Sequence, residues 1–193
     1  GTNGRELWRT NGLDAGTRMV KDIVPGSVDA FPTSGNNYGD KTSGVSLGNF
    51  VYFGASTPDT GYELCRTNGA EAGTVQVKEI YPGTTGSNPA QFTALGSKIL
   101  FAATDPTAGT ELFVSDGTAN GTKLLKDINP GWISSSPGFI CQNNGIAYYK
   151  ATSAEGTELW RTDGTEAGTF ILGDLTPGSS NSSPYLRGTT SNK

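Results

Sequence analysis

A short motif occurs four times in this chain and restricts what it can fold into more than any other feature. Each copy reads Gly-x-Glu-Leu and ends on Asn-Gly or Asp-Gly, and the copies are 4–12, 61–69, 109–117 and 156–164. The glutamates are spaced by 57, 48 and 47 residues, so the unit is about 47 residues long, with an insertion of about ten residues within 29–44. A unit this short cannot bury its apolar face alone, which predicts an array of units packed on one another.

Each unit contains four short runs of β-branched and aromatic residues, separated by Gly, Pro, Asn and Asp. In the third unit these runs are 91–95, 98–103, 111–115 and 122–128. Such runs are typical of strands joined by tight turns, and no stretch shows sustained helical periodicity. The sequence therefore predicts an all-β fold, a β-propeller-like array of four-stranded blades with about four repeats. A parallel β-helix is the alternative, but its rungs are shorter and lack these hairpins.

The repeats divide the chain into one domain made of unequal pieces. The expected pieces are a half blade (1–26), a blade with an insertion (27–83), two further blades (84–131 and 132–178) and a closing strand (179–193). The final segment, 189–193, is polar where an apolar second strand is expected. Three alternatives follow: the blades close imperfectly, the chain is part of a longer array, or a neighbouring copy supplies the missing strand.

Composition excludes several classes of function. The chain has no histidine, which rules out Ser-His-Asp triads, Cys-His pairs and histidine-ligated metals. Its net charge is −4 and its isoelectric point is near 4.8, so we expect no binding to nucleic acid or to anionic membranes. No run approaches 18 apolar residues, so we expect no insertion into a membrane. The first four residues are not a signal peptide, although a mature chain would have lost one.

The two cysteines, Cys65 and Cys141, lie two units apart. A disulfide between them would have to cross the array. We therefore expect two separate buried thiols.

Two repeated positions in the third strand of each unit are expected to be structural, because a residue needed once for chemistry need not recur in every blade. The first holds a glutamate that we expect to be partly buried and to need a partner. The second, two residues later, holds an aromatic residue or cysteine that we expect to pack between blades. The glutamates are Glu6, Glu63, Glu111 and Glu158, and the second set is Trp8, Cys65, Phe113 and Trp160.

Recurring lysines in the fourth strand suggest a partner for the glutamates. They are Lys21, Lys78 and Lys126, but Gly173 takes this position in the last unit. An ion pair is therefore a hypothesis for three units, and general acid–base chemistry by the glutamates is the alternative.

The Asn-Gly and Asp-Gly pairs are expected to form turns, because these residues adopt positive φ and bond to their own loops. Calcium at Asp116 and Asp163 is an alternative, weakened by the uncharged Asn11 and Asn68 at the same position. We expect no other cofactor and no metal.

The connections between units differ from one another, and variable loops on a rigid scaffold are where binding usually resides. They offer aromatic rings for stacking on sugars and polar groups for sugar hydroxyls. The candidate binding residues are Trp132, Tyr38, Asp59, Asp105, Glu155 and Tyr185. A glycoside hydrolase, which needs two carboxylates about 5–9.5 Å apart, would draw them from Asp59, Asp105 and Glu155.

A resemblance to a known family adds to these expectations. The strings Glu-Leu-Trp-Arg-Thr-Asp-Gly-Thr-Glu-Ala-Gly-Thr (158–169) and Lys-Asp-Ile-Asn-Pro-Gly (126–131) resemble the ELWxxDGT repeats of large secreted bacterial proteins. The likeness covers almost the whole chain and departs at Cys65 and Gly173. It implies a secreted or cell-surface protein of propeller-like repeats, and it implies no catalytic residue.

The expected function is therefore a non-catalytic extracellular module for adhesion, protein–protein interaction or self-assembly. Its expected partner is itself or another extracellular protein. A glycan-binding module that uses the loops between blades is the alternative.

Overall fold

The computed structural model describes residues 2–31, 44–182 and 184, which contain fourteen strands and one short 3-10 helix (Asp14–Gly16). All-β architecture is thereby confirmed. The strands are β1 (Leu7–Arg9), β2 (Arg18–Lys21), β3 (Gly44–Leu47), β4 (Phe50–Thr57), β5 (Gly61–Thr67), β6 (Val75–Lys78), β7 (Ala90–Leu95), β8 (Lys98–Asp105), β9 (Gly109–Ser115), β10 (Lys123–Lys126), β11 (Gly138–Asn143), β12 (Ile146–Ser153), β13 (Gly156–Thr162) and β14 (Phe170–Gly173).

Three complete sheets follow the predicted repeat, each with four antiparallel strands in chain order: β3–β6, β7–β10 and β11–β14. The pairing register is the same in each sheet. Phe53 lies opposite Cys65, Phe101 opposite Phe113, and Tyr149 opposite Trp160. The first sheet contains only β1 and β2. Most of the predicted closing strand, 179–193, and most of the predicted insertion lie outside the described residues.

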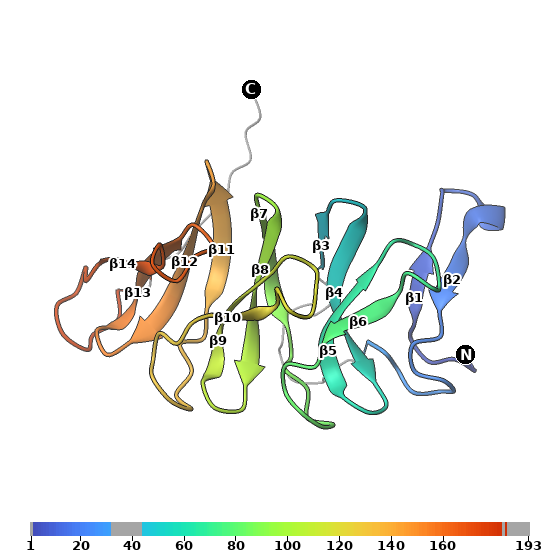
Figure 1. The fold of residues 1–193 in the computed structure, drawn as a ribbon, viewed down its shortest axis with the longest axis horizontal. Coiled ribbons are helices and arrows are strands. Elements are labelled where there is room, and N and C mark those ends of the chain that lie inside the picture. The colour runs from blue at the N-terminus through green and yellow to red at the C-terminus, as the bar shows by residue number, and fades with distance from the viewer. Residues whose placement is uncertain (1, 32–43, 183, 185–193) are drawn as a thin grey trace.

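The four sheets stand side by side in chain order, with the β1–β2 sheet and the β11–β14 sheet at opposite ends of the row (Figure 1). Neighbouring complete sheets meet through their first strands, because β3 lies beside β7 and β7 beside β11. The described sheets thus form an open row. The described residues contain no helix that is long and apolar enough to cross a lipid bilayer.

The apolar core lies between successive sheets, because alternate residues of each strand point to opposite faces. One cluster joins the second and third sheets, where the rings of Phe101 and Phe113 lie 5.8 Å apart. Another joins the third and fourth sheets and includes Leu112 and Tyr149, both without exposed surface. A smaller cluster joins Leu7 of the first sheet to the second. Every complete sheet therefore depends on a neighbour for the burial of its apolar residues.

Both cysteines are free, as predicted. Cys65 is buried in the cluster between the first two sheets, and burial raises the pKa of its thiol to about 12. Cys141, in β11, is only half-buried, so the prediction of a buried thiol is wrong for this residue.

Candidate functional site

The repeated glutamates are buried, as predicted, but the expected ion pair with lysine is wrong. Glu63 instead accepts hydrogen bonds from the backbone N–H groups of Ile80, Tyr81 and Ser87 at 3.1, 2.9 and 3.0 Å. The Ser87 hydroxyl donates a further bond at 2.5 Å. In the same way, Ser135 donates hydrogen bonds from its N–H and hydroxyl groups to Glu111, and Ser182 donates them to Glu158. Each carboxylate therefore ties the third strand to the connection that leads into the next unit.

The protonation of these carboxylates depends on how deeply each is surrounded. Burial raises the pKa of Glu111 to about 7, and it also raises the pKa values of Glu6 and Glu63. In the last sheet the hydrogen bond from Ser182 dominates and lowers the pKa of Glu158. All four have their oxygens occupied by the chain's own donors. This supports a structural rather than an acid–base role.

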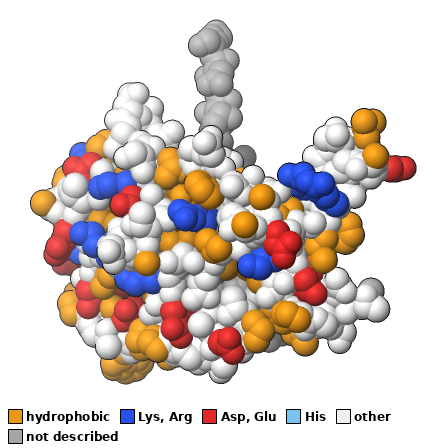
Figure 2. All heavy atoms as spheres, turned by 45° about the vertical axis from the view of Figure 1, so that its right-hand side comes forward, with side chains coloured by type: hydrophobic (Ala, Val, Ile, Leu, Met, Phe, Trp, Pro, Cys, Tyr) orange, Lys and Arg blue, Asp and Glu red, His pale blue; other side chains and the backbone are white. Residues whose placement is uncertain are grey.

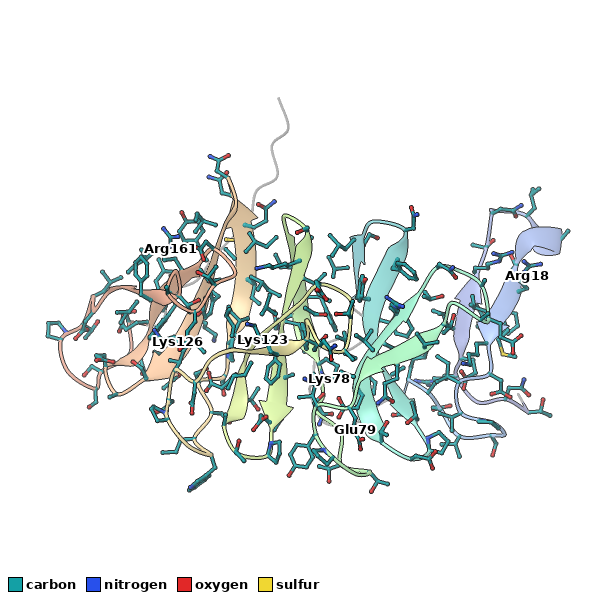
Figure 3. The ribbon with its side chains drawn as sticks, in the orientation of Figure 1. Arg18, Lys78, Glu79, Lys123, Lys126 and Arg161 are labelled. Carbon is teal, nitrogen blue, oxygen red and sulfur yellow. The ribbon has the colours of Figure 1, made fainter. Side chains whose placement is uncertain are left out.

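The recurring lysines connect one sheet to the next. Each donates its Nζ hydrogen bond to a backbone carbonyl in the following sheet, on the threonine of the Gly-Thr pair. The bonds are Lys21 to Thr74 at 2.9 Å, Lys78 to Thr122 at 2.6 Å and Lys126 to Thr169 at 2.8 Å. Figure 3 shows Lys78 and Lys126 between successive sheets. The recurrence of these lysines is visible in the sequence. Their acceptors, however, are backbone carbonyls and not the glutamates.

At each junction between sheets, a second positively charged side chain donates a hydrogen bond to the next sheet. The sequence did not lead us to expect these bonds. Arg9 and Arg66 each donate through Nη1 to a backbone oxygen of the next sheet's turn, Gly69 and Gly117, at 2.8 Å. At the third junction the arginine position is Val114. There, Lys98 of β8 donates to the oxygen of Gly164 at 3.2 Å. The recurrence of arginine after the aromatic position was the signal that could have revealed these contacts.

The aromatic position packs between sheets, as predicted, in three of the four units. Cys65, Phe113 and Trp160 are 3, 3 and 7% exposed. Trp8 is 60% exposed, so the prediction is wrong for the first unit. Its ring lies on the face that would meet a preceding sheet, and the described residues contain none.

The opposite end of the row also exposes residues that are buried elsewhere. Leu172 and Leu175 are 47 and 69% exposed, whereas their equivalents in the third unit, Leu125 and Ile128, are 4 and 7% exposed. Arg161 faces the same way and makes no hydrogen bond to another sheet among the described residues, whereas Arg66 donates through Nη1 to the oxygen of Gly117. The Arg161 guanidinium lies 5.0 Å from the centre of the Phe170 ring. Among the described residues, no sheet stands against either of these two faces.

The loop candidates are spread over different units. Trp132 is 81% exposed. The connection between β10 and β11, which contains Trp132, meets the β8–β9 turn, where Thr110 N–H donates to Ser134 Oγ at 2.9 Å. The connection between units and the turn between the second and third strands therefore lie together there. Tyr38 and Tyr185 lie outside the described residues.

The candidate carboxylates belong to three separate sheets: Asp59 and Glu155 lie in turns, and Asp105 is the last residue of β8. Against the effect of burial, hydrogen bonds from Thr107 and Ala108 lower the pKa of Asp105. A bond from Ser153 lowers the pKa of Glu155. None of the interactions of the described residues joins two of these carboxylates.

The Asn-Gly and Asp-Gly turns have the predicted geometry. Asn68 Oδ1 accepts from Ala70 N–H at 3.1 Å, and Asp116 Oδ1 accepts from Thr118 N–H at 2.9 Å. Hydrogen bonds from Thr118 lower the pKa of Asp116, with the Thr118 hydroxyl as the largest cause. Within the described residues, no three His, Cys, Asp or Glu side chains come together in a way that could hold a metal ion.

A groove lies between β1 and the second sheet. Its volume is about 650 Å³, and its walls include Leu7, Trp8, Phe31, Val51 and Phe53. Figure 2, which brings this end of the row forward, shows apolar side chains on the surface together with positively and negatively charged ones.

Comparison with known proteins adds only weak likenesses. No protein-family model and no curated protein matches the chain. Its fold is similar to part of a puromycin hydrolase mutant complexed with PGG, with a TM-score of 0.49, 13% identity and 75% of this chain covered. A nidogen/laminin complex gives a TM-score of 0.40, 16% identity and 68% coverage. The chain spans 21 and 46% of those chains. Likenesses at this level carry no argument about function.

Proposed function

We propose that this chain is a non-catalytic extracellular repeat module that works through contacts with proteins, including copies of itself. The observation that carries the proposal is the pair of junction faces, one on the first sheet and one on the last, that no described sheet covers. Leu172, Leu175 and Arg161 stand at one end. At the other end stands Trp8, with the carbonyl groups of Gly12 and Thr17 in the positions that accept bonds at internal junctions.

A second copy placed head to tail would bring these faces together as at an internal junction. Its Leu172 and Leu175 would cover Trp8, as Leu125 and Ile128 share one apolar cluster with Trp160 in the core between the last two sheets. Arg161 would reach the oxygen of Gly12, as Arg66 reaches Gly117. Such a contact joins two different surfaces, so it can close into a ring or extend into a filament.

The propeller-like arrangement and the extracellular location belong to the same proposal. Four-stranded antiparallel sheets that meet through their first strands are consistent with blades of a propeller. The resemblance of 158–169 to the ELWxxDGT repeats supports a secreted or cell-surface location.

Light scattering over a wide concentration range tests the proposal. We expect the solution mass to rise with concentration and Leu172→Lys to return the chain to the 20.1 kDa monomer. Val75→Lys is the matched control, because Val75 is similarly exposed, at 39%, on an internal sheet. A constant monomer mass at all concentrations would contradict self-assembly.

Glycan binding is a second candidate, favoured by the exposed ring of Trp132 beside a polar turn. We expect Trp132→Ala to reduce glycan binding without unfolding the chain, whereas Trp8→Ala, at the end of the row, leaves it unchanged. Equal glycan binding by the parent chain and both variants would remove the loop site.

A further inference from the structure

The junction between the third sheet (β7–β10) and the fourth (β11–β14) departs from the repeat. At the junction before it, the Arg66 guanidinium lies 4.5 Å from the centre of the Phe50 ring and bonds to the oxygen of Gly117. In the third sheet, Val114 and Lys98 hold the positions of Arg66 and Phe50. With valine in place of arginine, a cleft of about 350 Å³ opens between the third and fourth sheets.

Four charged side chains line this cleft where the preceding junction has uncharged ones. They are Lys98, Asp116, Lys123 and Glu166, in place of Phe50, Asn68, Val75 and Ala119. Lys123 lies at the start of β10 (Figure 3). The preceding junction forms without these charges, so the architecture of the repeat does not require them. Their gathering around one cleft points to a local role.

Most of the bonding capacity of these four groups is unused by the chain. Asp116 Oδ1 accepts hydrogen bonds from Thr118, whereas Asp116 Oδ2 accepts none among the described residues. The bonds from Thr118 lower the pKa of Asp116, so its carboxylate is ionised at neutral pH. Lys98 donates one bond, to the oxygen of Gly164, and has two further N–H donors. Within the part of the chain that the structure describes, none of the four charges forms an ion pair.

The rest of the cleft wall is largely apolar. Val114 and Leu125 are 3 and 4% exposed, and Leu124 beside them is half-buried. The cleft thus combines two cations, two anions and an apolar surface. An ion of one sign would meet two like charges as well as two opposite ones, and like charges placed together are costly. A molecule that carries both signs can pair with both.

We propose that this cleft binds a small zwitterion with an apolar side chain, of which a free α-amino acid is the simplest. Its carboxylate pairs with Lys98 and Lys123, and its ammonium group pairs with Asp116 and Glu166. Its side chain lies against Val114, in the space that arginine fills at the preceding junction. The cleft volume is within the range of small-molecule sites. None of the residues of the head-to-tail contact or of the Trp132 loop lines this cleft, so the site is independent of the functions proposed above.

Isothermal titration calorimetry of the whole chain with three related compounds tests the two charges of the ligand. Free leucine carries both charges, leucinamide keeps only the ammonium group, and N-acetylleucine keeps only the carboxylate. We expect saturable binding of free leucine, with each of the other two weaker by at least about tenfold. The proposal is overturned if free leucine shows no saturable binding, or if either single-charge compound binds as well.

Variants of the chain test the place of binding. We expect Lys123→Met and Glu166→Gln each to weaken leucine binding by about fivefold or more. Glu71→Gln is the matched control, because Glu71 holds the position of Glu166 in the second sheet and does not line the cleft. Equal weakening by Glu71→Gln and Glu166→Gln would overturn the assignment to this cleft.

A further variant fills the cleft with the residue that the repeat has elsewhere. We expect Val114→Arg to reach the oxygen of Gly164, as Arg66 reaches that of Gly117, and to abolish leucine binding. Its thermal unfolding should occur at or above the temperature of the parent chain, which separates a filled cleft from a disrupted fold. Leucine binding by folded Val114→Arg with the affinity of the parent chain would place the ligand elsewhere and overturn the proposal.

Discussion

Trp8 and Trp160 hold the same position of the repeat, yet 60% of the first and 7% of the second is exposed. Their local sequences are nearly identical, Glu-Leu-Trp-Arg-Thr in both. The difference lies in the preceding sheet. Trp160 shares an apolar cluster with Leu112 and Leu125 of the sheet before it, whereas no sheet stands before β1 among the described residues. Burial in this fold is therefore a property of the junction between two sheets, not of a single sheet.

Internal junctions and end faces should consequently differ in energy as well as in exposure. In repeat proteins, stability is approximately a sum of terms for each unit and for each contact between neighbouring units. Equivalent substitutions at an internal junction and at an end face therefore measure how much the contact between neighbouring units contributes to stability.

The largest difference is expected for the two tryptophans. Trp160→Ala should lower the free energy of unfolding by about 3–5 kcal/mol, because it removes a buried aromatic ring and leaves a cavity. Trp8→Ala should cost less than about 1 kcal/mol, because the ring is mostly solvated. Urea unfolding at concentrations where the chain is monomeric measures both, and equal losses would contradict the comparison.

The turn glycines provide the next difference. Gly117 and Gly12 have φ of +89° and +88°, so alanine is strained at either position, at a cost of about 1 kcal/mol. A Cβ at Gly117 would also lie 2.0 Å from the Tyr52 hydroxyl of the preceding sheet, whereas nothing lies within 4 Å at Gly12. We expect Gly117→Ala to cost about 1–2 kcal/mol more than Gly12→Ala. Thermal unfolding of the two variants is the measurement, and equal shifts would mean that the Gly117 turn does not touch the preceding sheet.

The buried carboxylates predict a dependence on pH. The pKa of Glu111 rises from an ordinary 4.5 to about 7 on folding, so the native chain takes up a proton that the unfolded chain releases. This contribution to stability is present below about pH 4.5 and is lost as the pH rises towards 7. Relative to Glu111→Gln, the parent chain should lose on the order of 2 kcal/mol between pH 5 and pH 8.

Glu158→Gln is the control for this pH dependence. The folded pKa of Glu158 is lowered, so its contribution is present above its unfolded pKa and is lost only as the pH falls below that value. Its difference from the parent chain should stay constant between pH 5 and pH 8 in the same denaturation series. If stability relative to Glu158→Gln changed with pH as it does relative to Glu111→Gln, the pKa values of the two glutamates would not differ in the way described.

The smallest difference concerns the cations. Lys78→Met removes a hydrogen bond of 2.6 Å from a charged donor to the oxygen of Thr122, and it should cost about 1.5 kcal/mol. Arg161→Met, on the end face, should cost about 0.5 kcal/mol, since it loses only the contact with Phe170. Urea midpoints compare the two, and a larger loss for Arg161→Met would indicate that the end face is already covered in solution.

Much of the fold could be predicted from the sequence because the relevant interactions are local. Alternating apolar residues and the Asn-Gly and Asp-Gly turns specify hairpins whose partners are close in the chain. The burial of Glu63 and Glu111 could be predicted as well, since they alternate with core leucines on strands packed on both faces. Their partners could not, because Ile80 and Ser87 approach Glu63 from segments 17 and 24 residues away.

The sequence by itself determined the number of units, the strands and the turns, since each depends on residues within one repeat. Only the tertiary structure decided that Lys78 reaches the oxygen of Thr122, that Trp8 is exposed while Trp160 is buried, and that a groove opens over Val51. The reason is that a sheet presents two faces with the same pattern of residues at every repeat. Whether a face is core or surface depends on whether another sheet stands against it.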